Sequence, residues 1–234
     1  MSVKIENQLS LEEAANIASG LKKSVCNSIF GQEGLITETL CCLLSGGHIL
    51  VTGAPGLAKT TLVRIFAKHL GIDFGRIQFT PDLLPSDIIG SEILNIDPVT
   101  GERKFMFSKG PIFTNLLLAD EINRASPRTQ SALLEAMQER TCTVGGDIHN
   151  LSDAFMVFAT QNPFESEGTF PLPEAQLDRF LAHTLVGYPD KASEEQILHA
   201  HVENRLIGEK RHVDKTEVSV KLDEVVELCN NPIP

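Results

Sequence analysis

The sequence lacks a long apolar run, a leader-like N-terminus and any paired-cysteine motif. No stretch approaches the roughly 18 apolar residues of a membrane-spanning helix, and the first residues do not have a signal-peptide profile. The cysteines are odd in number and show neither Cys-x-x-Cys spacing nor a zinc-ligand pattern with histidine: Cys26, Cys41, Cys42, Cys142 and Cys229. Because unpaired thiols are typical of a reducing compartment, we expect a cytoplasmic protein without a membrane span.

Positive charge is also in short supply. The chain has 20 Lys and Arg against 31 Asp and Glu, which gives a formal net charge of −11. This excess of acidic residues argues against extensive electrostatic binding of nucleic acid, although it is compatible with a local basic pore. At 234 residues, the chain is long enough for one sizeable α/β core and part of a second, smaller unit.

A glycine-rich segment lies between an apolar run, Ile49–Val51, and a helical pattern that begins near Leu62. It reads Gly53-Ala54-Pro55-Gly56-Leu57-Ala58-Lys59-Thr60-Thr61. Such a turn between strand and helix points backbone N–H groups at a polyphosphate, and the helix N-terminus adds partial positive charge. Lys59 would bind the β- and γ-phosphates and Thr60 would bind Mg²⁺. The strict motif has Gly where this chain has Ala58, and a turn without a ligand is the alternative interpretation.

A second apolar run, Leu116–Ala119, ends in two acids, Asp120 and Glu121. This pattern is typical of a buried parallel strand whose carboxyl end reaches a site. Asp120 is placed to bind Mg²⁺, and Glu121 to polarise a water for attack on the γ-phosphate. The alternative is a strand that ends in a solvated acidic turn.

Strand and helix patterns alternate along the chain. Ser10 and Glu13 form a capping box that predicts a helix, Ser126 and Pro127 predict the start of another, and a helical stretch spans 35–44. Strands are predicted at 48–52, 76–80, 115–119, 154–160 and 182–186. Such alternation predicts an α/β fold with a parallel sheet covered on both faces.

Two further segments have the turn signals of hairpins, within 91–112 and within 140–153. Both hairpins are candidates for contact with a substrate; the alternative is that they are loops of the core without a function of their own. In the first, Phe105, Met106 and Phe107 are either aromatic and apolar residues at the tip or the apolar face of the hairpin.

Two polar residues near the predicted strand ends are also candidates for the site. Asn162 follows the strand at 154–160, where its amide could orient the attacking water or contact the γ-phosphate, or simply cap a turn before Pro163. Arg179 is either a surface ion-pair partner or an arginine finger that stabilises transition-state charge in an adjacent subunit.

In combination, these segments resemble the MoxR family of AAA+ ATPases: 53–60, 116–125, 129–139, 159–163 and 173–180. Ala58 in place of Gly is also usual in that family. The resemblance covers roughly residues 25–190. It implies a P-loop NTPase core with five parallel strands in the order 5-1-4-3-2, a hairpin inserted in helix 2 and another before the sensor 1 residue, Asn162.

The same resemblance implies a ring, usually hexameric, with ATP between subunits. Phe30, Gly31 and Gln32 would then lie at the adenine, and Arg179 would be the finger, with Arg124 as a lower-ranked interface candidate. The expected division is an N-terminal helical segment (1–24), the AAA+ core (25–190), and a linker with the start of an incomplete helical lid (191–234). In that last part, Ser193 and Gln196 predict the start of one helix, and 222–229 is a candidate for another. The helical lid of the family carries an arginine called sensor 2, and neither Arg205 nor Arg211 can be assigned to that role.

The residues and the resemblance together predict Mg²⁺-dependent ATP hydrolysis coupled to remodelling or maturation of a protein partner. Family analogy adds a partner with a von Willebrand factor A domain and, in some cases, metal or cofactor insertion. Two alternatives stay open: a nucleotide-gated scaffold with little hydrolysis, and a related nucleic-acid motor or transcription activator, which the acidic balance disfavours.

Overall fold

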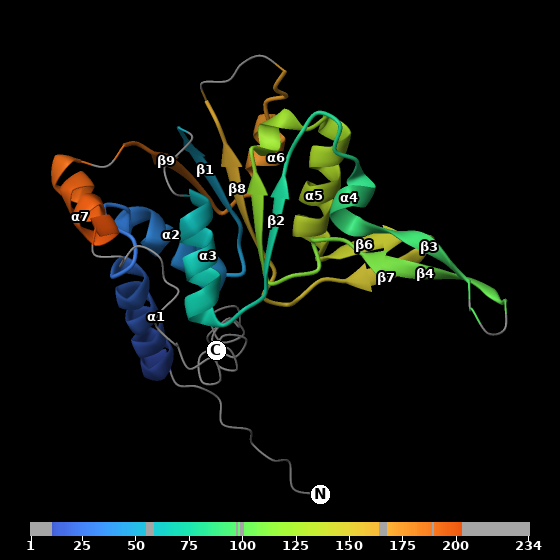
Figure 1. The fold of residues 1–234 in the computed structure, drawn as a ribbon, viewed down its shortest axis with the longest axis horizontal. Coiled ribbons are helices and arrows are strands. Elements are labelled where there is room, and N and C mark those ends of the chain that lie inside the picture. The colour runs from blue at the N-terminus through green and yellow to red at the C-terminus, as the bar shows by residue number, and fades with distance from the viewer. Residues whose placement is uncertain are drawn as a thin grey trace, which may run out of the picture.

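A five-stranded parallel sheet is the centre of the fold (Figure 1). The computed structural model describes residues 11–54, 59–96, 98, 101–163, 168–188 and 190–202. The sheet has the strand order β2 (Phe74–Gln78), β5 (Leu116–Asp120), β8 (Met156–Gln161), β1 (Ile49–Gly53) and β9 (Ala182–Val186). Read from β9 and numbered along the chain, this is the expected order 5-1-4-3-2.

Helices cover both faces of the sheet (Figure 1). One face carries α1 (Leu11–Cys26), α2 (Glu33–Leu44) and α3 (Lys59–Leu70), and the other carries α4 (Pro85–Ile89) and α5 (Pro127–Glu139). The shorter η1 (Ile122–Arg124) and α6 (Glu174–Leu177) lie in loops, and α7 (Lys191–Val202) follows β9. None of the described helices combines the length and the apolar character that a membrane span requires.

Strand β5, which lies between β2 and β8, packs against both helical layers. Leu116 and Leu118 belong to the apolar cluster with α1, α2 and α3, whereas Leu117 and Ala119 belong to the cluster with α4 and α5. All four are fully buried. Successive side chains of a strand point to opposite faces, so a strand covered on both sides is apolar throughout, which explains the uninterrupted run in the sequence.

Both predicted hairpins are confirmed. The first pairs β3 (Gly90–Ile96) with β4 (Arg103–Lys109), and the second pairs β6 (Thr141–Val144) with β7 (Asp147–Asn150). The β3–β4 hairpin projects away from the sheet, with β6–β7 beside its base (Figure 1).

The β3–β4 hairpin interrupts a helical segment, but only its first half is an α-helix. The chain leaves α4 at Ile89 and returns at Gly110, where Gly110 N donates to Ile89 O at 3.4 Å and Ile112 N donates to Ile88 O at 3.2 Å. Beyond this point the chain forms turns until β5. The hairpin expected inside helix 2 therefore follows an α-helix, α4, but no second helical half follows it. Gly90 has a φ of 96°, a conformation that favours glycine at this close crossing.

Four of the five predicted strands have different bounds in the structure. β1 and β5 are each shifted by one residue from the predicted 48–52 and 115–119, and the other two differ by more. β2 spans Phe74–Gln78, not 76–80, because Phe79 turns into the core and Pro81, two residues on, has no N–H for a ladder. β8 begins at Met156, not 154, because Phe155 N closes a turn on Ser152 O at 3.0 Å.

The helix starts were predicted with mixed success. Ser126 caps α5 as expected, with its hydroxyl accepting from Thr129 N at 3.4 Å. The cap of α7 is Asp190 and not Ser193, because the Asp190 carboxylate accepts from Ser193 N at 2.9 Å and the helix starts at Lys191. The predictions for Ser10, Arg205, Arg211, the 222–229 helix and Cys229 concern residues outside the described ones. The other four cysteines are unpaired.

A buried histidine joins three elements of the core. His48, just before β1, donates from Nε2 to Met137 O at the end of α5 (3.2 Å) and accepts at Nδ1 from Val157 N of β8 (3.0 Å). Burial lowers the pKa of His48 to about 4; the bond to Met137 O opposes this change and the charge of Arg140 adds to it. His48 is therefore neutral in the folded protein at neutral pH.

The His48 pKa predicts a loss of stability in acid. The folded value of about 4 lies below the ordinary 6.5, so the unfolded chain binds more protons in this window, and stability is full above 6.5 and falls as the pH drops towards 4. The free energy of unfolding should lose up to about 1.4 kcal/mol per pH unit through this one group. Urea unfolding across the window should show a shallower pH slope for His48→Gln.

The matched control is His199→Gln, which removes an exposed histidine of α7 and should keep the wild-type slope. Equal slopes for wild type and His48→Gln would contradict the assignment of a neutral, buried His48.

Candidate functional site

The predicted site residues gather at one edge of the sheet. β1, β8 and β5 are neighbours and run parallel, so their carboxyl ends meet at the same edge. Gly53 ends β1, Asp120 ends β5, and Asn162 follows β8 directly. Clefts at such strand ends are where open α/β sheets bind ligands.

Lys59 begins α3 and points back to the end of β1. Its Nζ donates to Gly53 O at 2.8 Å. Gly53 and Ala54 are buried, Lys59 and Thr60 are half-buried in the first turn of α3, and Thr61 is exposed. The rest of the predicted loop, Pro55 to Ala58, lies outside the described residues.

Electrostatics link Lys59 to the two acids of β5. Burial lowers the pKa of the Lys59 ammonium, while the charges of Asp120 and Glu121 act in the opposite direction. The two acids therefore favour the charged form of Lys59. The structure thus brings together three of the residues that the sequence singled out, one from the start of α3 and two from the end of β5.

Asp120 uses both carboxylate oxygens. Oδ2 lies 2.9 Å from the Arg76 guanidinium of β2, and Oδ1 accepts from the Thr160 hydroxyl of β8 at 2.7 Å. The Asp120 side chain is 14% exposed and that of Arg76 is 44% exposed. An ion pair with one partner this exposed contributes at most about 1 kcal/mol, so Arg76 can exchange with another cation.

Glu121 lies at a sharp turn and is held from two sides. Its backbone has φ 57° and ψ 50°, the left-handed conformation. Its Oε2 accepts from Gln78 Nε2 of β2 at 3.0 Å and from Arg124 Nε at 2.9 Å. A non-glycine residue in this conformation is uncommon and is often found at functional sites.

Arg124 was predicted as a lower-ranked candidate for a subunit interface. The structure places its guanidinium on Glu121 of the same chain.

Asn162 is buried and 5% exposed, so its amide is held in the protein interior at the end of β8. Its backbone carbonyl accepts from Asn123 Nδ2 at 3.5 Å, which connects the segment after β8 to the segment after β5. The predicted role of the Asn162 side chain stays a prediction.

Phe30 and Gly31 lie in the turn between α1 and α2. Gly31 has a φ of 73°, and Phe30 is half-buried. Within the described part of the chain, no hydrogen bond joins these two residues to the end of β1. Their predicted contact with an adenine stays a prediction.

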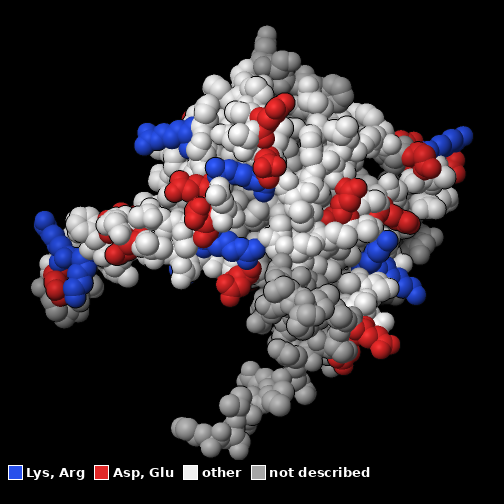
Figure 2. Space-filling model, turned by 180° about the vertical axis from the view of Figure 1, so that it is seen from behind, with Lys and Arg blue, Asp and Glu red and all other residues white. Residues whose placement is uncertain are grey.

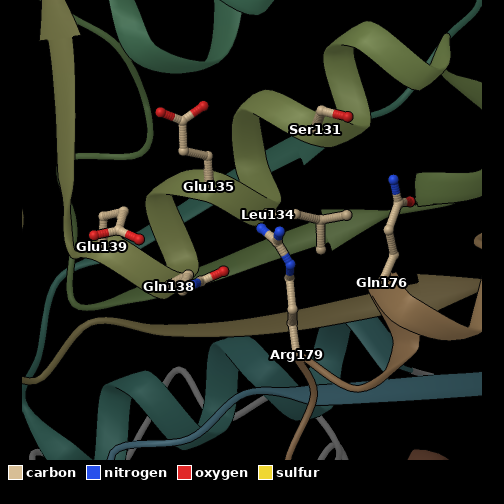
Figure 3. A pocket seen from close by; sticks show the side chains of 7 residues that line it. All are labelled: Ser131, Leu134, Glu135, Gln138, Glu139, Gln176 and Arg179. Atoms are coloured by element: carbon tan, nitrogen blue, oxygen red, sulfur yellow. The ribbon is translucent and has the colours of Figure 1, made fainter.

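Arg179 lies apart from the other site residues. It is exposed after α6, and its side chain reaches across towards α5 (Figure 3). It borders a surface hollow of about 360 Å³ lined by Ser131, Leu134, Glu135, Gln138, Glu139, Gln176 and Arg179. This lining includes none of the residues at the strand ends, so Arg179 does not join them within one chain.

Three residues that contact the two acids were not predicted from the sequence: Arg76, Gln78 and Thr160. Arg76 and Gln78 share one face of β2, and Thr160 is a fully buried polar residue of β8. The sequence offered two signals for these residues. Arg76 and Gln78 are polar residues at alternate positions near a strand end, and Thr160 carries a hydroxyl inside an apolar run. Neither signal shows that β2 and β8 both lie beside β5.

Known proteins resemble this chain in sequence. The family described as "ATPase family associated with various cellular activities (AAA)" matches residues 48–182. The protein YeaC of Bacillus subtilis is 53% identical over 168 residues, which is 72% of this chain and 51% of that protein. Chaperone MoxR1 of Mycobacterium tuberculosis is 52% identical over 171 residues, covering 73% of this chain and 44% of that protein.

A solved structure resembles the fold as well. A crystal structure of a candidate ATPase from Cytophaga hutchinsonii superimposes with a TM-score of 0.76 and 41% sequence identity, covering 93% of this chain and 63% of that one. The chain spans about half the length of the curated relatives named above. The family match over residues 48–182 and the 52% identity to Chaperone MoxR1 show the family of this chain, and the resemblance to the solved structure shows the same fold. The chain belongs to the MoxR family of AAA+ ATPases.

Proposed function

We propose that this chain hydrolyses ATP with Mg²⁺, in a site shared between subunits of a ring, and couples hydrolysis to the remodelling of a protein partner in the cytoplasm. The observation that carries the proposal is the placement of Lys59, Asp120 and Glu121 at one edge of the sheet. Phosphoryl transfer to water needs a phosphate-binding cation, a metal ligand and a group that activates water. These three residues can supply one function each.

The phosphates would bind between the end of β1 and the start of α3. Lys59 would exchange its bond to Gly53 O for bonds to the β- and γ-phosphates. Backbone N–H groups of 53–60 and the N-terminus of α3 would complete the anion site.

Thr60 and Asp120 fit a magnesium ion. Hydroxyl and carboxylate oxygens are the ligands that Mg²⁺ prefers, and Asp120 Oδ2 already lies 2.9 Å from a cationic group, the Arg76 guanidinium. A bound Mg²⁺ supplies neutralisation of phosphate charge. Thr60 is adjacent to Lys59 in the first turn of α3, so the phosphate and metal functions would come from successive residues.

Glu121 would accept a proton from the attacking water. Gln78 and Arg124 contact its Oε2, and the second carboxylate oxygen, Oε1, would accept that proton. Asn162 would orient the same water from the end of β8.

Arg179 would act in the site of an adjacent subunit. It is exposed, and within the described residues no ion pair binds it. Its separation from the strand ends of its own chain supports a role in trans, where a guanidinium stabilises transition-state charge on the phosphates. A closed ring, hexameric by family analogy, would place one Arg179 at each site.

Arg179→Ala therefore separates a shared site from a site complete in one chain. Turnover per subunit of the wild-type protein should rise with protein concentration, because assembly completes the site. Arg179→Ala should bind ATP but lose about a thousandfold in turnover at every concentration. Phosphate release measured over a concentration series is the test.

The matched control is Arg103→Ala, which removes an exposed arginine of the β3–β4 hairpin and should follow the wild-type curve. Turnover that is independent of concentration, and equal in wild type and Arg179→Ala, would contradict a shared site.

The β3–β4 hairpin is our candidate for contact with the protein partner. It exposes apolar side chains on both strands, including Phe105 (69% exposed) and Met106 (51%), and opposite them Ile93 and Leu94. Its base is fixed, because Phe107 stacks on His149 of the second hairpin with ring centroids 4.0 Å apart. Exposed apolar groups on a fixed base suit the capture of unfolded polypeptide.

The surface charge and a relative's name support a protein partner. On the face in Figure 2, basic side chains of the described residues lie among acidic ones and do not form a continuous basic field. Nucleic-acid binding relies on such a field. The M. tuberculosis relative is named a chaperone, and family analogy adds a partner with a von Willebrand factor A domain.

Phe105→Ser tests the hairpin as a client contact. It should weaken binding of a fluorescently labelled, reduced and carboxymethylated lactalbumin by about fivefold, the effect of losing about 1 kcal/mol at an interface. ATP turnover without polypeptide should stay at the wild-type value, because Phe105 is remote from the strand ends.

Lys104→Ser, an adjacent and equally exposed change, is the control and should bind the polypeptide as the wild type does. Wild-type affinity in Phe105→Ser by fluorescence anisotropy would exclude this hairpin residue as a client contact.

A further inference from the structure

Thr160 connects the two acids of the site through one hydroxyl group. Its Oγ1 donates to Asp120 Oδ1 at 2.7 Å and accepts from the backbone N–H of Glu121 at 2.9 Å. Thr160 is fully buried. The hydroxyl thus uses its donor and an acceptor lone pair in a place where a missing partner would be costly.

The Thr160 hydroxyl forms its hydrogen bonds just beyond the point where the backbone pairing of β5 with β8 ends. The register of these strands ends at Ala119 opposite Ala159, one residue before Asp120 and Thr160. Two residues beyond Ala119, Glu121 N donates to the Thr160 hydroxyl, and the backbone of Glu121 has the left-handed conformation. The Thr160 side chain therefore fixes the turn that sets the directions of both acids.

Because Thr160 binds one carboxylate oxygen of Asp120, the two oxygens have different surroundings. Oδ1 faces the buried hydroxyl, while Oδ2 faces Arg76, whose side chain is 44% exposed. A solvent-exposed guanidinium exchanges more readily than a buried hydroxyl, since its ion pair is weak and it stays hydrated. Only Oδ2 is thus available for a cation that replaces Arg76.

On the proposed function, we infer that Thr160 is a positioning residue for the metal: it holds Asp120 by Oδ1 so that Oδ2 faces Mg²⁺, and it fixes Glu121 through its backbone N–H. Thr160 also pairs through its own backbone with Val51 of β1, the strand that leads into the phosphate loop. One residue of β8 therefore ties the metal ligand to the phosphate-binding strand.

Thr160→Val and Thr160→Ser separate the hydroxyl from the shape of the side chain. Valine keeps the branched shape and removes both hydrogen bonds, whereas serine keeps the hydroxyl and removes only a methyl group. The readout is the Mg²⁺ concentration that half-saturates binding of a fluorescent ATP analogue, with binding in EDTA as the metal-free reference. Thermal unfolding without nucleotide reports whether each variant is folded.

Thr160→Val should raise the half-saturating Mg²⁺ concentration by about tenfold or more, because a hydrogen bond to a charged ligand is lost. Its affinity for the analogue in EDTA should stay at the wild-type value, since Lys59 and the loop are unchanged. Thr160→Ser should resemble the wild type in both measurements. An unchanged Mg²⁺ requirement in Thr160→Val, or an equal rise in Thr160→Ser, overturns the inference.

Arg76→Gln is the second variant, and it remains decisive even when Thr160→Val does not fold. Removing the guanidinium that competes at Oδ2 should lower the half-saturating Mg²⁺ concentration. An unchanged or higher value overturns the inference that Oδ2 is the oxygen of Asp120 that faces Mg²⁺. Failure of the proposed function looks different, because the wild-type protein itself would then bind no analogue or show no response to Mg²⁺.

Discussion

Backbone pairing of β5 with β2 on one side and β8 on the other is the constraint on which the rest of the structure depends. Register places Gln78 of β2 opposite Asp120 and Ala159 of β8 opposite Ala119. A slip of one residue in either ladder would turn every side chain of the slipped strand to the opposite face. The contacts of Arg76, Gln78 and Thr160 with the two acids all depend on this register, and the apolar interior of β5 on both faces is what enforces it.

The site concentrates charge that is largely balanced within the chain. Asp120 pairs with Arg76 and Glu121 with Arg124, while Lys59 donates to the end of β1 and the charges of both acids favour its charged form. Both arginines are partly solvent-exposed, so their ion pairs are weak and can rearrange. A site built this way keeps its acids ordered, yet it can change partners when phosphate and metal charges enter.

The sequence was sufficient for features that depend on a few consecutive residues. The position of Lys59 at the start of the helix after β1, the two acids after an apolar strand and the Ser126 cap could all be predicted, because turn chemistry and strand polarity are local properties. Arg76 and Thr160 could not be predicted, since their contacts with Asp120 join residues 44 and 40 positions apart in the chain and depend on which strands are neighbours. The start of α7 was misassigned because Asp190 and Ser193 are both good caps, and only the fold decides between them.

The most direct measurement compares ATP binding and ATP hydrolysis in the wild-type protein and in Glu121→Gln. Glutamine keeps the size of the side chain and its contact with Gln78 but cannot accept the proton of the attacking water. The proposed function predicts that Glu121→Gln binds ATP with wild-type affinity and loses about a hundredfold or more in phosphate release. Equal phosphate release by the two proteins would contradict the role of Glu121, and with it the assignment of the strand ends as a hydrolytic site.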